Sequence, residues 1–525
     1  MQLDYRQNRG LGYIPSIVFV IFMLGYSSML YGQTRHPMGL VLDDESYLEV
    51  PESSANVQIY GGQKAIPRAL DLTPYCPEVR NQGDISSCVG WSAGYAAMTI
   101  ERALQQGWTD KRQITENANS ALFVYNQLAN GDCQGVRMPK ALQLLADQGN
   151  CLAREYDFDV NDCSADVPIE LISKAKDYRI DEHIRLFDPK ASPETKVRHA
   201  KLVLSQDKPV IVGMRVLNNF YAIDDGDESW FPTIGDQTYA GGHAMVVVGY
   251  DDDKFGQGDP NISPEMSGAF KIMNSWGKNW GQHGFIWVRY SHFGSYCRHA
   301  YALMLQGGEP IDFDADTSPQ TAAQPNLGQD LRVLGGSFGF KLFTNRWVGN
   351  KPLFKEKEVV LQENHYVLRN RLVGDQFQLF VQSDFEGGFI YVFSVDPTGK
   401  HEVHFPRSAE YNKKFTDENE SALLLSKGSM LTIPTYETVL TVAHPGVDHL
   451  VVLFSERKIK SKYIKYLSET LALGEGLIQE NLPRILQKHM IPFADITYRP
   501  NQMGFEVSTR SSGKIVPIIL KVEAD

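Results

Sequence analysis

The feature that most constrains the fold of this chain is a cysteine, Cys88, at the start of a glycine-containing helix. Apolar residues recur at helical spacing over residues 86–104, and the two serines before Cys88 can cap the first turn, so this stretch is predicted to be helical. Gly90 and Gly94 lower the helix propensity of the stretch. We therefore expect close packing against a neighbouring element to hold this helix in place.

The position of Cys88 in the first turn also carries chemistry. The positive end of a helix dipole favours the thiolate over the thiol, and the thiolate is the nucleophilic form of cysteine. Cys88 is therefore a candidate nucleophile. For an isolated cysteine, a small buried apolar residue is the more common interpretation, so the assignment depends on the rest of the sequence.

Two later segments contain partners for such a nucleophile. Two glycines precede His243 and the apolar run 244–248 follows it, which predicts a buried strand with free space beside the histidine. Asn274 directly follows a second predicted strand, residues 269–273, and two Trp-Gly steps come after it. A polar insertion, residues 251–267, joins the two strands. A lone histidine or asparagine is usually structural, but here the order Cys, His, Asn and the local contexts agree.

Together these segments resemble the papain (cathepsin-like) family of cysteine peptidases. That family shows Gln-Gly before Ser-Cys, His-Ala before a Val-Gly-Tyr strand, and Asn-Ser-Trp-Gly followed by a second Trp-Gly. The resemblance covers about residues 66–306, which is less than half of the chain. It implies an α+β fold, a papain-like cysteine peptidase domain of two lobes.

The resemblance implies a role for each matching residue. Cys88 and His243 would share a proton as a thiolate–imidazolium pair. Asn274 would accept the other imidazole N–H and fix the orientation of the ring. Gln82, six positions before Cys88, would form the oxyanion hole with its side-chain amide and the backbone N–H of Cys88.

Two further matching residues are expected in the substrate groove. Trp276 would shield the histidine–asparagine hydrogen bond from water, and Gly135 would let an extended substrate backbone approach. The implied reaction is acyl transfer, in which Cys88 attacks a peptide carbonyl, His243 protonates the leaving amine, and water hydrolyses the thioester. A protein or peptide substrate is expected, and no cofactor.

The sequence departs from the family pattern near the nucleophile and before the enzyme. Val89 stands where a tryptophan usually follows the catalytic cysteine. Ile85 replaces a usual cysteine, so a common disulfide is missing, although Cys133 lies where its partner is expected. The five cysteines other than Cys88 allow at most two disulfides, with the pairing open. Residues 33–65 are too short for the family's large helical inhibitory propeptide, which leaves zymogen control open.

The beginning of the chain predicts export. Arg6 and Arg9 form a weakly basic start, residues 14–24 are almost continuously apolar, and residues 31–33 are a plausible cleavage neighbourhood, so residues 1–32 are predicted to be a signal peptide. The apolar run is short for a membrane span, which needs about 20 residues; an uncleaved anchor is the alternative. We expect a secreted or periplasmic protein without a stable membrane span after cleavage.

The second half of the chain has a different texture. Residues 307–330 are acidic and rich in proline, glutamine, alanine and glycine, which is typical of a linker. Residues 331–525 alternate like strands, residues 389–405 predict a β-hairpin, and a lysine-bearing helix follows Ile459. We expect a β-sandwich-like accessory domain, which weakly resembles a β-rich domain of unknown function in some bacterial peptidases. It contains no recognisable catalytic set and is a candidate for binding a protein or a surface ligand.

Composition and motifs exclude several other functions. A formal net charge of −12 argues against a nucleic-acid partner. The acidic runs at 251–253 and 312–316 lack the glycine and final glutamate of a calcium loop, so no metal site is expected. Two alternatives stay open: a papain-fold enzyme that transfers the acyl group to an amine, and a catalytically silent binding protein. Retention of all four matching catalytic residues argues against the silent protein.

Overall fold

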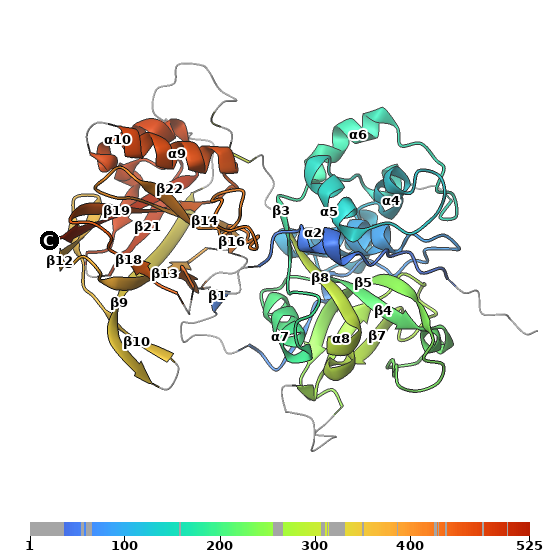
Figure 1. Ribbon diagram of the computed structural model, residues 1–525. Coiled ribbons are helices and arrows are strands. Elements are labelled where there is room, and N and C mark those ends of the chain that lie inside the picture. Colours follow the sequence, from blue (N-terminus) through green and yellow to red (C-terminus); the bar gives the residue numbers. More distant parts are fainter. Residues whose placement is uncertain are drawn as a thin grey trace, which may run out of the picture. The chain divides into compact units, whose positions relative to one another are not determined.

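The helix predicted at Cys88 is present in the computed structural model of the chain (Figure 1). It begins at Cys88, continues as a π-helix over Gly90–Ala97 (η2) and ends as the α-helix Met98–Gln106 (α2). A Cβ atom at Gly90 would lie 2.3 Å from the carbonyl oxygen of Ala121, the first residue of helix α4 (Ala121–Ala129). The absence of a side chain at Gly90 thus allows the close packing that we expected.

The structure describes most of the chain after residue 35. The residues described are 36–525 except 54–56, 59–65, 157–158, 256–265, 306–309, 312, 314–330, 349–350, 386, 425–427, 429, 436–437, 475–476 and 501. The predicted signal peptide, its cleavage neighbourhood, most of the predicted linker and the middle of the 251–267 insertion therefore lie outside the described residues. Residues 36–525 belong to one compact unit.

A seven-stranded sheet forms one lobe of the peptidase-like part, by which we mean residues 66–306. Its order is β3-β8-β4-β5-β6-β7, with β2 paired to β5. The strands are β2 (Ala69–Asp71), β3 (Glu182–Arg185), β4 (Val210–Leu217), β5 (Tyr239–Asp251), β6 (Ala269–Met273), β7 (Phe285–Arg289) and β8 (Cys297–Met304). Strand β5 is antiparallel to both β4 and β6, so His243 lies opposite Met214 and Val246 lies opposite Met273. This register brings the beginning of β5 to the end of β6, where Asn274 follows.

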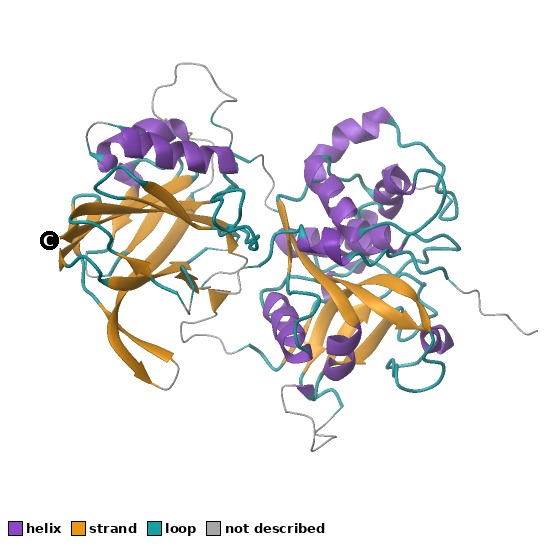
Figure 2. Cartoon of the chain, in the orientation of Figure 1, coloured by secondary structure: helices purple, strands orange, loops and turns teal. Residues whose placement is uncertain are grey.

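Helices form the other lobe and flank the sheet. Figures 1 and 2 show η2–α2, α4, α5 and α6 gathered on one side of the sheet. Helices α7 and α8 pack directly against its strands. The helices not yet bounded are α1 (Asp44–Leu48), α3 (Lys111–Glu116), α5 (Met138–Asp147), α6 (Ile169–Ala175), α7 (Pro193–Leu204) and α8 (Tyr290–Tyr296). The predicted α+β fold with two lobes is confirmed.

One disulfide joins Cys133 to Cys163 in the helical lobe. Cys76, Cys88, Cys151 and Cys297 are buried thiols. The sequence left the pairing open, and the structure selects the two cysteines that approach to a Cα–Cα distance of 5.3 Å.

The C-terminal β-region, residues 332–524, contains two further sheets. One has the order β1-β17-β13-β9-β21-β20, with β10 and β18 attached, and the other has the order β11-β12-β22-β19-β14-β15, with β16 attached. Apolar side chains from both sheets share a core that includes Phe338, Leu379, Val392 and Val452. The strands are β9 (Arg332–Val348), β10 (Lys351–Glu356), β11 (Val360–Gln362), β12 (His365–Arg371), β13 (Gln376–Ser383), β14 (Gly388–Val395), β15 (His401–Phe405), β16 (Leu423–Leu424), β17 (Met430–Ile433), β18 (Leu440–Thr441), β19 (Gly446–Ser455), β20 (Ile496–Tyr498), β21 (Gly504–Thr509) and β22 (Ile515–Ala524). The predicted β-rich region and its β14–β15 hairpin are confirmed.

Two strands of these sheets, β22 and β1, come from unexpected places in the sequence. Helices α9 (Ser461–Leu473) and α10 (Ile478–Leu486) are followed by β20–β22, and β22 lies inside its sheet between β12 and β19. Strand β1 (Val57–Gln58) precedes the whole peptidase-like part, yet it pairs with β17. The C-terminal β-region therefore incorporates a strand from the N-terminal end of the described chain.

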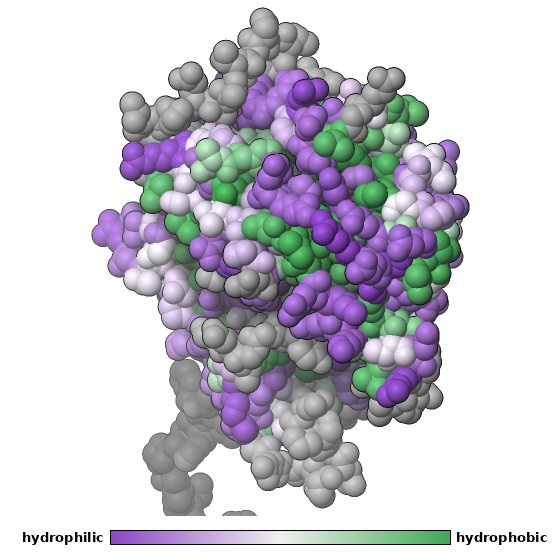
Figure 3. All heavy atoms as spheres, turned by 90° about the vertical axis from the view of Figure 1, so that its left-hand side faces the viewer, coloured by the Kyte–Doolittle hydropathy of each residue, from purple (hydrophilic) through white to green (hydrophobic). Residues whose placement is uncertain are grey.

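The surface of the molecule mixes polar and apolar residues. Figure 3 shows hydrophobic side chains interspersed with hydrophilic ones on the face viewed there. Val333, Leu372 and Leu473 are examples of exposed apolar residues in the C-terminal β-region. Scattered residues of this kind are normal and do not mark an interface. In the part of the chain that the structure describes, no helix has the length and apolar character that crossing a membrane requires.

Candidate active site

Cys88 lies at the junction of the two lobes, at the beginning of its helix and against strand β5. Its sulfur accepts a hydrogen bond from the backbone N–H of Ala244, with an N–S distance of 3.4 Å. Ala244 follows His243 directly in β5. The side chains of Cys88 and His243 are both fully buried. The sheet register and the helix start therefore bring the first two predicted catalytic residues together.

His243 and Asn274 form the hydrogen bond that the sequence predicts. His243 Nε2 lies 2.8 Å from Asn274 Oδ1, which also accepts the backbone N–H of Ser275 at 2.8 Å. The indole of Trp276 packs against the imidazole with ring centroids 5.1 Å apart, and Trp276 is 5% exposed. His243 Nδ1 is buried and has no hydrogen-bond partner among the described residues. One imidazole nitrogen is thus fixed, and the other is left for proton exchange.

Gln82 is held beside this pair by the segment that follows Asn274. Its backbone N–H donates to the carbonyl of Ser275 at 2.7 Å, and its Oε1 accepts the hydroxyl of Ser275 at 2.8 Å. Its Nε2 donates to the carbonyl of Ile85 at 3.0 Å and to the carbonyl of Pro37 at 3.2 Å. The side-chain amide predicted for an oxyanion hole is therefore already bonded to a peptide carbonyl of this same chain.

That carbonyl belongs to the N-terminal segment, defined here as residues 36–53 and 57–58. Its residues 39–41 lie between Val136 of the helical lobe and Gly242 of strand β5, and the space that they fill is called the groove here. Leu40 N–H donates to the Gly242 carbonyl at 3.0 Å, and Val136 N–H donates to the Gly39 carbonyl at 3.0 Å. Leu40 and Val136 form a parallel β-bridge. The N-terminal segment is thus bonded to both walls of the groove.

Glycines make this approach possible. A Cβ atom at Gly135 would lie 2.8 Å from the carbonyl oxygen of Gly39, and one at Gly242 would lie 2.4 Å from the carbonyl oxygen of Leu40. Side chains at either position would push the N-terminal segment out of the groove. Gly135 therefore admits an extended backbone, as the sequence predicts, and in this structure that backbone is the protein's own.

Covering the groove changes the ionisation of both reactive groups. Burial raises the pKa of Cys88 to about 11, although backbone N–H groups, that of Gly39 among them, act in the opposite direction. Burial likewise lowers the pKa of His243 to about 4, against the effect of the hydrogen bond to Asn274. In the covered groove both groups are neutral near pH 7, so the ion pair expected from the sequence is not favoured in this state.

Sequence reasoning missed the residues that cover the site. Residues 33–65 read as polar and irregular, whereas the structure gives Pro37 a contact with Gln82 and His36 a contact with Trp276. His36 packs on Trp276 with ring centroids 5.2 Å apart, and Tyr221 stacks on Trp276 at 5.6 Å and donates its hydroxyl to the His36 carbonyl. The short apolar run 38–42 was the one sign in the sequence that this stretch is buried.

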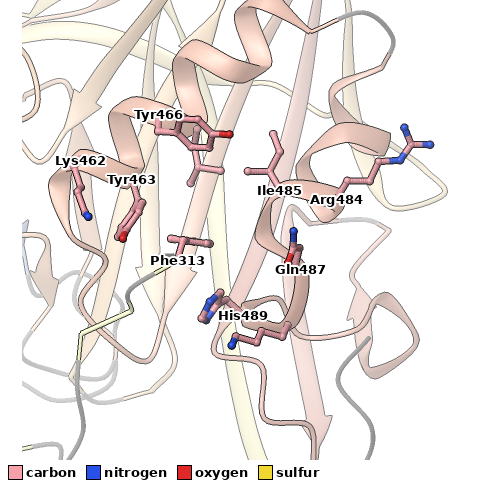
Figure 4. Close-up of a pocket in the computed structure, with 10 residues that line it drawn as sticks. Phe313, Lys462, Tyr463, Tyr466, Arg484, Ile485, Gln487 and His489 are labelled. Atoms are coloured by element: carbon pink, nitrogen blue, oxygen red, sulfur yellow. The ribbon is translucent and has the colours of Figure 1, made fainter. Parts of the chain in front are cut away.

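A separate cavity lies in the C-terminal β-region between helices α9 and α10. Its volume is about 490 Å³, and Figure 4 shows Tyr463 and Tyr466 from α9, Arg484 and Ile485 from α10, and Phe313 from the stretch before β9. The lining is basic and aromatic and includes none of the predicted catalytic residues. Among the described residues, no three His, Cys, Asp or Glu side chains gather where they could hold a metal ion.

Comparison with known proteins finds relatives of the peptidase-like part. Residues 66–304 match the family model described as papain family cysteine protease. A cysteine endopeptidase of Oryza sativa subsp. japonica is 26% identical over 285 residues, which are 53% of this chain and 64% of the rice protein. An uncharacterized peptidase C1-like protein of Acanthamoeba polyphaga mimivirus is 22% identical over 265 residues, which are 48% of this chain and 78% of the viral protein.

Solved structures match the same half of the chain. Xylellain, a cysteine protease from Xylella fastidiosa, is 22% identical with a TM-score of 0.40, and the match covers 51% of this chain and 96% of xylellain. Digestive procathepsin L 3 of Tenebrio molitor is 19% identical with a TM-score of 0.35, and covers 50% of this chain and 77% of that structure. By the family match, residues 66–304 are a region of the papain family of cysteine proteases.

Proposed function

We propose that the protein is an exported cysteine-type peptidase whose catalytic residues are Cys88, His243, Asn274 and Gln82. The observation that carries this proposal is the hydrogen bond of 2.8 Å between His243 Nε2 and Asn274 Oδ1 next to the buried sulfur of Cys88. This bond leaves Nδ1 as the imidazole nitrogen available for the thiol proton. A nucleophile, a base and a group that orients the base are the parts that covalent acyl transfer requires.

The proposed reaction proceeds through a thioester. In the open groove the Cys88 thiolate attacks the carbonyl carbon of a peptide bond, and the negative charge on the oxygen is stabilised by Gln82 Nε2 and the Cys88 backbone N–H. His243 gives its proton to the leaving amine. The neutral His243 then takes a proton from water, which attacks the thioester; the acid is released, and Cys88 leaves as the thiolate beside the protonated His243. The substrate is a protein or peptide.

The proposal includes a latent state. The carbonyl of Pro37 is bonded to Gln82 Nε2, and the backbone of residues 39–41 is bonded to the groove walls at Gly242 and Val136. The parallel bridge between Leu40 and Val136 fixes the direction of this backbone in the groove. A substrate needs the same hydrogen-bonding groups, so catalysis requires the N-terminal segment to leave.

We also propose an organisation and a location for the whole chain. Residues 1–32 are a signal peptide, 33–65 a short N-terminal stretch, 66–306 the peptidase domain, 307–330 a linker and 331–525 a β-rich accessory domain that binds a protein or surface ligand. The location is secreted or periplasmic. The disulfide between Cys133 and Cys163 is compatible with an oxidising compartment.

Active-site labelling tests the peptidase proposal. The reduced protein, before and after limited proteolysis of the N-terminal segment, is treated with an epoxide-type cysteine-peptidase inactivator, and the modified residue is mapped by mass spectrometry. We expect labelling at Cys88 that increases after proteolysis and is lost in Cys88→Ala and His243→Ala. Absence of Cys88 labelling once the segment has been removed would favour the silent binding protein instead.

Products distinguish hydrolysis from acyl transfer to an amine. A labelled peptide substrate is incubated with the proteolysed enzyme in the presence and absence of an added primary amine. Free acid as the main product in both cases supports the peptidase. Predominant amide formation at low amine concentration would indicate a transamidase.

A further inference from the structure

The N-terminal segment does not end at the groove but continues across the peptidase-like part. Helix α1 places Tyr47 in a fully buried site, where its hydroxyl donates to the carbonyl of Phe187 at 2.8 Å and its ring stacks on His299 at 4.2 Å. Asp44 accepts hydrogen bonds from Arg298 and His299. These contacts hold the middle of the N-terminal segment on the peptidase side.

The next residues lie between two β-edges. Glu52 forms parallel bridges to Arg185, the last residue of β3, and to Glu420 in the C-terminal β-region. On the peptidase side, Arg185 N–H donates to the Pro51 carbonyl at 2.9 Å, and the Arg185 guanidinium pairs with the Glu52 carboxylate at 2.7 Å.

On the other side, the C-terminal β-region binds the same stretch. Glu52 N–H donates to the Asn419 carbonyl at 2.7 Å, and Ser421 N–H donates to the Glu52 carbonyl at 3.0 Å. The side-chain amide of Asn419 donates to the Glu49 carbonyl at 2.8 Å. Five residues later the chain forms β1, which pairs antiparallel with β17 through Val57–Leu431 and Gln58–Met430 (Figure 1). The N-terminal segment thus adds extended backbone to the C-terminal β-region at two places, residues 419–421 and strand β17.

From these contacts we infer that the C-terminal β-region is the receptor of the N-terminal segment and keeps it bound beside the groove after the chain is cut between β1 and the peptidase region. The binding surface consists of residues 419–421 and the edge of β17. Its partner is an extended peptide, recognised mainly through backbone hydrogen bonds, as in other strand additions. The C-terminal β-region would therefore set how long the groove stays covered after cleavage. This role rests on the proposed function, but binding itself can be measured without catalysis.

Charge and burial argue that this arrangement is built for the segment. Arg407, beside the receptor surface, pairs with Glu418 and Glu420 at 2.8 Å each. Burial raises the pKa of Glu52 despite its pair with Arg185, and the nearby Glu420 acts in the same direction. Glu52 thus has Arg185 on the peptidase side and Glu420 on the other, and its ion pair with Arg185 fixes its position along the edge.

The test cuts the chain without relying on its own activity. A recognition site for a sequence-specific protease is inserted between Gln58 and Ile66 in a Cys88→Ala background. After cutting, size-exclusion chromatography with mass spectrometry follows the release of the N-terminal fragment over time. The release variant combines Asn419→Ala with Val57→Pro and Gln58→Pro, because proline removes the N–H groups that pair β1 with β17. Asn412→Ala is the matched control, since the side chain of Asn412 bonds Glu402 and Val403.

In the parent and in Asn412→Ala, we expect the N-terminal fragment to stay bound to the rest of the cut protein. In the release variant, we expect the fragment to dissociate at least tenfold faster. A variant with only the two proline changes, which alter no residue outside the segment, should show an intermediate rate. Release from the parent within twofold of the rate from the release variant would overturn the inference, and so would an equal effect of Asn412→Ala.

The same proteins with Cys88 restored separate this inference from the proposed function. Labelling of Cys88 that rises in step with fragment release supports both. A fragment that is retained as inferred, in a protein whose Cys88 is never labelled after release, would overturn the peptidase proposal and support the receptor role of the C-terminal β-region.

Discussion

Single glycines decide how closely the N-terminal segment approaches the catalytic residues. Gly39 is the clearest case on the segment itself, because a Cβ atom there would lie 2.1 Å from the backbone carbonyl oxygen of Ser86. Backbone at Ser86 has little freedom to move, since it adjoins the helix that begins at Cys88. The closeness of the fit is therefore a property of the covered state and not of the open enzyme.

The substitution Gly39→Ala is expected to uncover the site. If the added methyl group destabilises the covered state by about 1.4 kcal/mol or more, the rate of Cys88 labelling in the uncut protein should rise at least tenfold. The measurement is the rate of modification of Cys88 by a small thiol reagent, mapped by mass spectrometry. Gly339→Ala is the control, since a Cβ atom there meets nothing within 4 Å. Equal rates in the two variants would contradict the prediction.

Gln82 is expected to act on the rate of the chemical step. In the enzyme freed of its N-terminal segment, Gln82→Ala should lower kcat about 10²- to 10³-fold with a smaller change in KM, because one oxyanion donor is lost. Steady-state kinetics on a peptide substrate provide the measurement. Gln143→Ala, which removes an exposed side chain bonded to Asp147, should leave both constants unchanged. A change confined to KM would assign Gln82 to substrate binding.

Acid is expected to loosen the N-terminal segment. Burial in the covered state lowers the pKa of His243 from its usual 6.5 to about 4. In Cys88→Ala, which has no thiolate to pair with the imidazole, this residue therefore favours covering fully above about pH 6.5 and progressively less as the pH falls toward 4. Two neighbouring histidines also favour the covered state at neutral pH over acidic pH. The electrostatic effect of His36 contributes to the lowered pKa of His243, and burial against α1 lowers the pKa of His299. The pKa of Asp44 is lowered by Arg298, so its contribution is lost only below the usual carboxylate range.

Hydrogen exchange of the Leu40 and Val41 backbone amides in Cys88→Ala measures this effect without the thiol. Protection factors, corrected for the intrinsic rate, should fall at least about tenfold between pH 7.5 and pH 5. The amides of β13 in the C-terminal β-region should keep their protection. Protection at Leu40 and Val41 that is constant or increases toward pH 5 would contradict the assignment.

At the scale of helices and strands, the sequence predicted the elements that have strong periodicity. The helix at Cys88, strands β5 and β6 and the β14–β15 hairpin occur where the patterns placed them. The π-helical stretch of η2 was not predicted, because the apolar periodicity that indicates a helix does not distinguish a π-helix from an α-helix. Strand β22 was not assigned either, since burial on both faces makes its apolar residues continuous and not alternating.

The proposed catalytic residues were predictable because each stands at or near the end of an element with a recognisable pattern. Cys88 begins a helix, His243 lies near the beginning of β5, and Asn274 follows β6. The residues that cover them were not predictable, because the backbone of this stretch pairs through an isolated bridge, between Leu40 and Val136. Such short pairings are set by tertiary contacts and leave no periodic signal in the sequence.

One ion pair connects the helical lobe to the sheet and should control stability. Lys208, just before β4, bonds Glu101 of α2 at 2.9 Å, and Glu101 is 3% exposed. Lys208→Ala should lower the free energy of unfolding by about 3–5 kcal/mol, because a buried carboxylate loses this partner. Urea unfolding measures the loss. The double variant Lys208→Met with Glu101→Leu should recover most of it; a double variant no more stable than Lys208→Ala would contradict this account.

At the scale of the whole molecule, the sequence identified the peptidase region and a β-rich second half but not how the two are connected. Pairs between the parts include Arg457 with Asp181 at 3.2 Å and Lys458 with Glu182 at 2.6 Å. In the sequence these four charged residues look like ordinary surface residues, and no neighbouring residue indicates which charges they pair with. The inferred role of the C-terminal β-region therefore rests on contacts between residues that are distant in the sequence.

The hydrogen bond from Asn419 to Glu49 joins residues 370 positions apart, and this separation has a consequence for the order of events during folding. Contacts between distant residues form late, because a long loop must close first. Residues 36–304 can place the N-terminal segment in the groove as soon as the peptidase region folds. The second set of bonds forms only after residues 419–421 and strand β17 have folded. A newly made molecule would thus pass through a stage in which the peptidase region alone holds the segment, and its inhibition would be weakest at that moment.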